Sequence, residues 1–227
     1  MKLKNYISGQ WIEGSGNEVP LYNAVIGELV AISDTEGIDF EAALDYGRTV
    51  GYKNLSSMTF YDRGEMLKKV ALYLLERKKK YYDLSYKTGA THADSWVDIE
   101  GGFGTFFTYS GLAKRMLPNT PFWVDGDTQK LGANGTFIGT HILTPSEGVS
   151  VQINAYNFPV WGILEKLSTS LLAGVPSIVK PATPGSYLTN AVFRDMIESG
   201  ILPEGAIQLV CGEPGNILDF VQDGDSV

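Results

Sequence analysis

Residues 148–180 read GVSVQINAYNFPVWGILEKLSTSLLAGVPSIVK, and their pattern decides the fold. An apolar strand at 148–153 runs through a turn into an apolar-faced helix, and a second apolar strand closes the stretch. The expected elements are a helix at about 160–173, the strand 176–180, a helix at about 186–199, the strand 206–212 and a short helix near 216–221. Continuously apolar strands that alternate with helices are typical of a parallel sheet covered on both faces. The sequence therefore predicts an α/β fold with a doubly wound, Rossmann-like parallel sheet.

The loops that follow the three strands are where function is expected. In such a sheet, ligands bind beyond the carboxyl ends of the strands. The loops 154–159, 180–185 and 212–215 each follow one of these strands, so they should share one rim.

Before residue 148 the chain changes character several times. The first residues alternate in short β-prone segments broken by glycines. Apolar residues recur on one helical face from Thr59, and that helix should continue toward Tyr82. A break at Gly89 precedes a second long helix, with Asp94 or Ser95 as its cap. The GGFG run in that helix has no preceding strand, so close helix packing is favoured over a phosphate loop.

Two β-rich segments are expected to form an arm. Residues 117–134 are rich in Pro, Gly, Asn and Asp and predict an exposed connection, and the next residues predict a β pair about the Pro-Ser-Glu-Gly turn at 145–148. We expect residues 1–22 and 135–147 to form a protruding oligomerisation arm, because exposed strand edges are usually covered by a partner. The cofactor-binding domain would then comprise residues 23–134 and 148–227, and the protein would be a homo-oligomer.

Composition excludes several classes of function. A net charge of −8 with 18 basic residues argues against a nucleic-acid partner. No apolar run is long enough for a membrane span or a secretory signal, so a cytoplasmic protein is expected. The two histidines match no metal spacing, and no metal site is predicted. The single cysteine, Cys211, ends an apolar run and is expected to be a buried strand-end residue, although a nucleophile remains the alternative.

The loop after the second strand, VKPATPG, carries a candidate cofactor contact. Lys180 stands at the strand end in a loop stiffened by two prolines, which suits the ribose or phosphate of a dinucleotide, although a surface lysine is the alternative. An acidic residue here would bond a ribose 2′-hydroxyl and repel a 2′-phosphate, whereas Thr183 tolerates the phosphate. NADP is therefore favoured over NAD.

The loop after the first strand carries two asparagines, Asn154 and Asn157. Asn157 precedes a proline-containing turn, Phe158-Pro159, and its amide is expected to project from the rim. The alternative is that Asn157 caps the helix that begins at Pro159. The residues alone leave both interpretations open.

The stretch 153–185 resembles the aldehyde dehydrogenase superfamily. An Asn-Phe-Pro turn, a helix with a lysine, an Ala-Gly pair and a Val-Lys-Pro-Ala strand end follow one another in that family's order and spacing. ISGQWIEG near the N-terminus and SGILPEGAIQLVCG before the third strand agree with it. The resemblance implies that Asn157 donates a hydrogen bond to the substrate oxyanion. It also implies that the cofactor is held by Ile153, Asn154, Ala155, Tyr156, Lys180, Ala182, Thr183, Gly212 and Gly215.

The same resemblance implies a thiolate mechanism, in which a cysteine attacks the aldehyde and a glutamate-activated water hydrolyses the thioester. Both residues are expected beyond Val227, as is the turn that caps the pyrophosphate, so this stretch alone is not expected to be active. Several segments also resemble the aldehyde dehydrogenase portion of bifunctional ring-opening proteins of phenylacetate degradation, which implies NADP and a CoA-linked semialdehyde. The alternative function is a non-catalytic nucleotide-binding or assembly fragment.

Other residues receive structural expectations. Glu165 and Lys166 are expected to form an ion pair behind the Asn157 loop, although Lys166 matches the family's helix lysine. Asp94, Asp98 and Glu100 resemble a carboxylate cluster, but Asp94 and Asp98 share a helical face only as like charges and should be solvated. Trp96 and Trp161 should be core aromatics.

Overall fold

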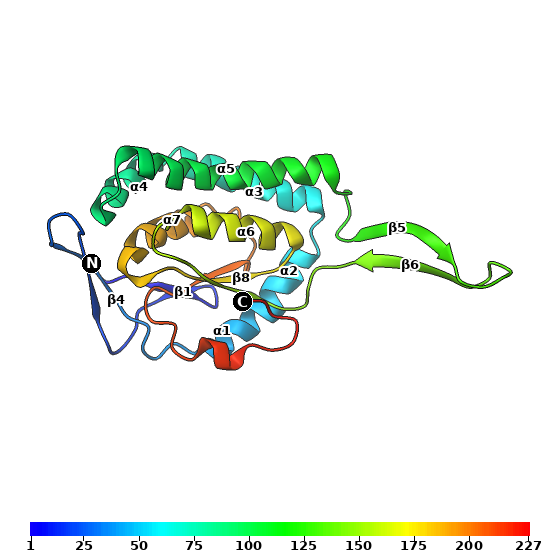
Figure 1. Ribbon diagram of the computed structural model, residues 1–227. Helices are drawn as coiled ribbons and strands as arrows, with labels where there is room; N and C mark the ends of the chain where they lie inside the picture. The colour runs from blue at the N-terminus through cyan, green and yellow to red at the C-terminus, as the bar shows by residue number, and fades with distance from the viewer.

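A computed structural model describes residues 1–227 and confirms the α/β fold with its parallel strands (Figure 1). The central sheet has five strands in the order β2-β1-β9-β8-β7. Its parallel part consists of β7 (Ser150–Ile153), β8 (Ser177–Lys180) and β9 (Ile207–Leu209). The helices α6 (Trp161–Ala173) and α7 (Ser186–Glu198) cover one face, and α1 (Phe40–Tyr46) with the 3₁₀ turn η4 (Ile217–Phe220) covers the other. The expected last helix near 216–221 is this single short turn.

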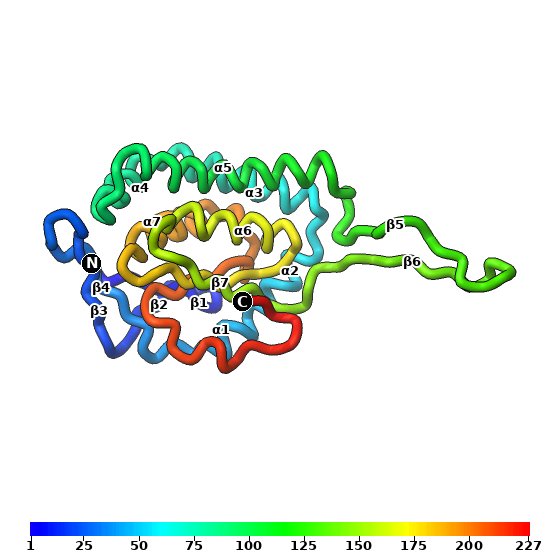
Figure 2. The backbone as a smooth tube through the Cα atoms, viewed as in Figure 1, coloured from blue at the N-terminus to red at the C-terminus, as the bar shows by residue number.

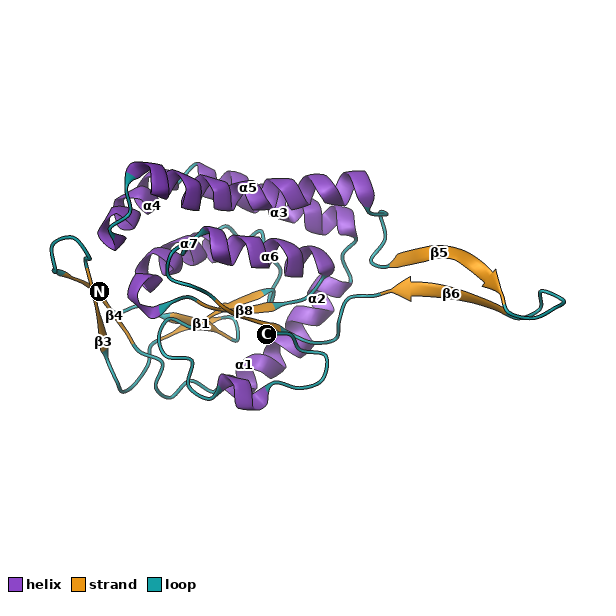
Figure 3. Cartoon of the chain, in the orientation of Figure 1, coloured by secondary structure: helices purple, strands orange, loops and turns teal.

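A second helical layer lies on top of α6 and α7 (Figure 3). It consists of α3 (Phe60–Leu75), α4 (Lys78–Ser85) and α5 (His92–Met116). The expected helix from Thr59 toward Tyr82 is thus two helices. The cap of α5 is Thr91, which forms a reciprocal capping box with Asp94, so neither expected cap residue is the N-cap itself. A main core of 31 buried residues fills the space between these layers and the sheet.

Two glycines inside α5, Gly101 and Gly102, serve close packing, as predicted for the GGFG run, whereas Gly104 has open space around it. A Cβ atom built on Gly101 would lie 2.4 Å from the Trp161 indole, and one on Gly102 would lie 3.1 Å from the Trp161 Cα atom. Helix α5 and the first turn of α6 therefore meet almost backbone to backbone.

The expected arm is partly wrong. Residues 1–22 do not protrude, because β1 (Asn5–Ile7) pairs with β9 and β2 (Gln10–Ile12) pairs with β1. The apolar side chain of Leu3 is buried, and the Asn5 carboxamide accepts a hydrogen bond from the backbone N–H of Cys211, so both hold this segment against the sheet. A further hairpin joins β3 (Val19–Tyr22) to β4 (Leu29–Ser33).

A long hairpin, β5 (Trp123–Lys130) with β6 (Ile138–Leu143), projects from the body (Figure 1; Figure 2). Residues 117–134 are therefore not only a connection, since they hold the hairpin's first strand. The β pair about residues 145–148 does not form, because β6 pairs with β5 while β7 pairs with β8. The turn lies instead near Gly135, whose φ of 66° suits glycine.

The remaining elements are short connections. They are the π-helical turn η1 (Gly47–Gly51), α2 (Tyr52–Ser56), and the 3₁₀ turns η2 (Tyr86–Thr88) and η3 (Thr183–Gly185). None of the helices is both long and apolar enough to span a bilayer.

Candidate active site

The three loops at the carboxyl ends of β7, β8 and β9 meet at one rim, as the sequence predicts. The backbone N–H of Asn154 donates to the Lys180 carbonyl over 3.0 Å, which ties the first loop to the second. The Thr183 hydroxyl donates to the Gly212 carbonyl over 3.3 Å, which ties the second to the third. Because the strands are parallel and adjacent, residues far apart in the sequence lie side by side here.

Asn157 projects from the loop between β7 and α6. Its side chain is exposed and makes no hydrogen bond within the chain. It lines two cavities of about 340 Å³ each. The first is bounded mainly by Val97 of α5 and by Phe158, Trp161 and Glu165. A carboxamide in this position has its N–H groups available to a ligand.

Helix α6 is capped by Asp98 and not by Asn157. The Asp98 carboxylate, which is only 4% exposed, accepts hydrogen bonds from the backbone N–H groups of Val160 at 3.0 Å and Trp161 at 2.8 Å. Burial raises the pKa of the Asp98 carboxyl to about 6, and the two N–H donors oppose that rise. The expectation that Asp98 is solvated is therefore wrong, because this face of α5 turns toward α6.

A second contact holds the same loop from the other side. The hydroxyl of Thr189 on α7, which is fully buried, donates to the Pro159 carbonyl over 2.9 Å. No sequence pattern pointed to Asp98 or Thr189, since each acts on a loop that lies at least 30 residues away.

The other asparagine, Asn154, is fully engaged. Its carboxamide donates to the Gln152 carbonyl over 2.8 Å and accepts from the Lys166 ammonium over 2.7 Å. Lys166 makes no ion pair with Glu165, so that expectation is wrong. Glu165 is exposed, has no cationic partner, and contributes a carboxylate to the cavity beside Asn157.

Lys180 and Thr183 are adjacent at the rim. The Lys180 ammonium lies 3.4 Å from the Thr183 hydroxyl oxygen. Burial lowers the pKa of Lys180, and the nearby Glu213 carboxylate opposes this shift. Gly215 adopts a φ of 53°, and a Cβ atom there would lie 2.7 Å from the Phe40 ring, so only glycine suits this turn. The expected cofactor residues Ala155, Tyr156, Ala182 and Gly212 lie on the same three loops, and Ile153 is the last residue of β7.

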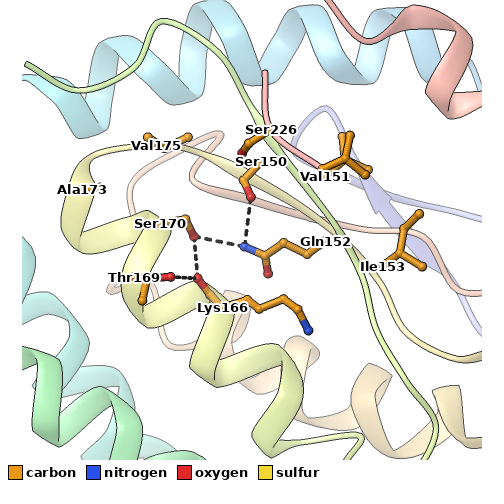
Figure 4. Close-up of a pocket in the computed structure, with 11 residues that line it drawn as sticks. Ser150, Val151, Gln152, Ile153, Lys166, Thr169, Ser170, Ala173, Val175 and Ser226 are labelled. Atoms are coloured by element: carbon orange, nitrogen blue, oxygen red, sulfur yellow. Dashed lines mark hydrogen bonds between the residues drawn. The ribbon is translucent and has the colours of Figure 1, made fainter. Parts of the chain in front are cut away.

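A larger cavity of about 540 Å³ lies between β7 and α6 (Figure 4). Lys166 lines both this cavity and the one beside Asn157. The Gln152 carboxamide donates to the hydroxyls of Ser170 and Ser177, while its oxygen is buried without a partner. These contacts anchor α6 to the strands.

The structure excludes Cys211 as a nucleophile and Trp96 as a core residue. Cys211 is fully buried, as predicted, and burial raises the pKa of its thiol to about 12, so no thiolate forms near neutral pH. Trp96 is 56% exposed, so the expectation that it is a core aromatic is wrong. No group of three or more potential ligand side chains is arranged to hold a metal ion.

Comparison with known proteins points to one family. The sequence pattern described as "Aldehyde dehydrogenase family" matches residues 11–225. The 3,4-dehydroadipyl-CoA semialdehyde dehydrogenase of Aromatoleum evansii is 40% identical over 228 residues, a match that covers 100% of this chain and 44% of that protein. The D-glyceraldehyde dehydrogenase (NADP(+)) of Picrophilus torridus is 25% identical over 99% of this chain and 44% of its own length. The chain thus spans less than half the length of these relatives.

Solved structures show the same fold. That of 3,6-anhydro-L-galactose dehydrogenase in complex with NADP superposes with a TM-score of 0.81 at 24% identity, covering 96% of this chain and 44% of that one. A betaine aldehyde dehydrogenase from Staphylococcus aureus in complex with NAD⁺ gives a TM-score of 0.76 at 23% identity, with 96% and 42% covered.

Proposed function

The chain belongs to the aldehyde dehydrogenase family, and from that membership we propose that it holds NADP and one oxyanion donor of a site that oxidises an aldehyde to the carboxylic acid. The observation that carries this proposal is the Asn157 carboxamide, which is free of hydrogen bonds and faces a cavity at the sheet's rim.

In the proposed reaction, a cysteine thiolate would add to the aldehyde carbon, and water would hydrolyse the thioester formed after hydride loss; NADP⁺ held at the rim would supply the hydride acceptor. Addition of the thiolate would place its negative charge on the former carbonyl oxygen. The Nδ2 group of Asn157 would donate a hydrogen bond to that oxygen, and such a donor is worth about 10²–10³ in rate. The buried Cys211 is not suited to supply the thiolate, because burial raises the pKa of its thiol to about 12.

The rim residues fit the adenosine end of the cofactor. Lys180 is half-buried and forms no ion pair, so it can bond a ribose hydroxyl or a phosphate. Thr183 places a neutral hydroxyl beside it. This pair favours the 2′-phosphate of NADP, while Glu213 works against it by adding a negative charge close to Lys180.

The substrate is proposed to be a CoA-linked semialdehyde. The 40% identical relative is named for such a substrate. The cavity beside Asn157 suits a substrate whose second carboxyl group is masked as a CoA ester. Among the residues that line the cavity, the Glu165 carboxylate has no ion-pair partner, and the ammonium of Lys166 is bonded to Asn154. A free carboxylate on the aldehyde would meet like charge there.

The projecting hairpin is proposed to bind a second copy of the chain. Its strands and the turn between them are exposed and carry large apolar side chains, namely Trp123, Val124, Phe137, Ile138, Ile142 and Leu143. Such a surface is typical of a protein interface. The oligomerisation arm would then be residues 123–143.

Cofactor preference is tested on the chain itself by titrating NADP and NAD. We expect tighter binding of NADP, and we expect Thr183→Glu to shift the ratio of the two dissociation constants toward NAD by about tenfold, or about 1.4 kcal/mol. Equal or tighter binding of NAD by the unaltered chain would refute the preference.

Catalysis is tested on the complete gene product. Asn157→Ala should lower kcat by about 10²–10³ with little change in KM, because the donor acts on charge that develops in the transition state. Asn119→Ala, an asparagine away from the cavities, is the matched control. An unaltered kcat in the Asn157 variant would remove this residue from the mechanism.

A further inference from the structure

We propose that Asp98 is a positioning residue that caps α6 from a neighbouring helix and thereby leaves the Asn157 carboxamide free for a ligand. This inference rests on the proposed function, since it matters for catalysis only if Asn157 donates to the substrate.

The first step concerns the start of α6. The Gly162 N–H donates to the Phe158 carbonyl over 3.0 Å, so helical bonding begins at Phe158, whose side chain has no acceptor. The N–H groups of Val160 and Trp161 in this first turn have no intrahelical partner. Asn157 is the polar side chain next to this turn, and asparagine is among the residues that cap helices most often.

The second step is that Asp98 satisfies these donors. Its Oδ1 atom accepts from both N–H groups, at 3.0 Å and 2.8 Å. The contact is possible because Gly102 has no side chain to hold α5 away from the backbone of Trp161. Thr189 holds the adjacent Pro159 carbonyl from α7. The loop is therefore fixed from two helices without using the side chain of Asn157.

The third step concerns the charges around Asp98. It forms no ion pair with any residue. On α5, Asp94 lines the cavity that Asp98 also lines, but its carboxylate is hydrogen-bonded to Thr91. On the loop between β7 and α6, the side chain of Tyr156 is exposed. On α6, Lys166 is turned to Asn154. Asp98 therefore acts through the two N–H groups and not through a neighbouring side chain.

The test uses the 227-residue chain and amide hydrogen exchange read by NMR. In Asp98→Ala, the Val160 and Trp161 amides should exchange about tenfold to a hundredfold faster, since a buried acceptor has been lost. The mid-helix amide of Leu167 should change much less. Asp98→Asn retains an acceptor oxygen and should not speed the exchange of these two amides. Asp94→Asn is the matched control, because Asp94 lies on the same helix and lines the same cavity but belongs to the capping box at the start of α5.

The decisive readout is the Asn157 side-chain amide, which a merely stabilising role of Asp98 would not affect. Its resonances should shift in Asp98→Ala, as the carboxamide turns to the helix, and remain unchanged in Asp94→Asn. Asp98→Val, which keeps more of the side-chain volume, serves if the alanine variant does not fold. Unchanged exchange at Val160 and Trp161, or unchanged Asn157 resonances, would overturn the proposal. None of these readouts requires aldehyde oxidation, so failure of the proposed function would be recognised separately.

Discussion

Replacing Asp98 with asparagine should make the protein more stable at neutral pH. The folded protein raises the pKa of this carboxyl from 3.8 to about 6, because burial disfavours the charged form more than the two backbone donors favour it. The folded state therefore binds the proton more tightly than the unfolded state does. By linkage, the Asp98 contribution to stability is full below about pH 4 and is lost as the pH rises toward about 6.

The magnitude follows from the same two values. At about 1.4 kcal/mol for each tenfold change in the dissociation constant, a rise from 3.8 to about 6 corresponds to about 3 kcal/mol at pH 7. The substituted asparagine side chain would be uncharged at every pH and would still accept a hydrogen bond through its oxygen. The Asp98→Asn variant should thus gain up to about 3 kcal/mol over wild type at pH 7 and little at pH 4.

The assay is urea unfolding of both proteins at intervals between about pH 4 and about pH 8. The difference between the two curves cancels other titrating groups, including Asp34 and Asp225, whose lowered pKa values give the opposite trend. A variant less stable than wild type at pH 7, or a difference that does not change with pH, would refute the reasoning.

Three further outcomes follow from packing and charge. Gly101→Ala should destabilise the fold by about 1–3 kcal/mol, read from the urea midpoint, because its Cβ atom would lie 2.4 Å from Trp161; Gly104→Ala, with open space around it, is the control. Cys211 should resist thiol reagents in the folded chain and react only in denaturant, and labelling at a free-thiol rate without denaturant would contradict its burial. Asp225→Asn should cost about 1–3 kcal/mol at pH 7, because it leaves the largely buried Arg48 with only the exposed carboxylate of Asp45 as an ion-pair partner, and thermal unfolding at that pH measures the loss.

The candidate site was predicted in outline because its main features are local. Apolar strands and helices alternate from residue 148 onward, and parallel connections of this kind bring the carboxyl ends of the strands to one edge. Pro159 stiffens the turn that follows Asn157 in any context, so an exposed Asn157 carboxamide was one of two outcomes that the sequence allowed. The choice between them depended on Asp98, which lies 62 residues earlier than Val160.

The wrong predictions share one cause. A sequence pattern indicates which segments form strands or helices, but it does not specify which other segments they pair or pack with. Strand β1 looked like part of an arm but pairs with β9, about 200 residues later, and the strand 135–147 was assigned the wrong neighbour. The sequence shows on which face of the helix Asp98 lies, but it does not show which neighbouring element that face packs against.

The sequence by itself determined which segments become strands and helices and which loops end at the rim, because periodicity and backbone stereochemistry act over a few residues. Only the tertiary structure decided that Asp98 caps α6 and that Asn157 stays free, because an N–H group bonds whichever acceptor the packing of helices brings within reach.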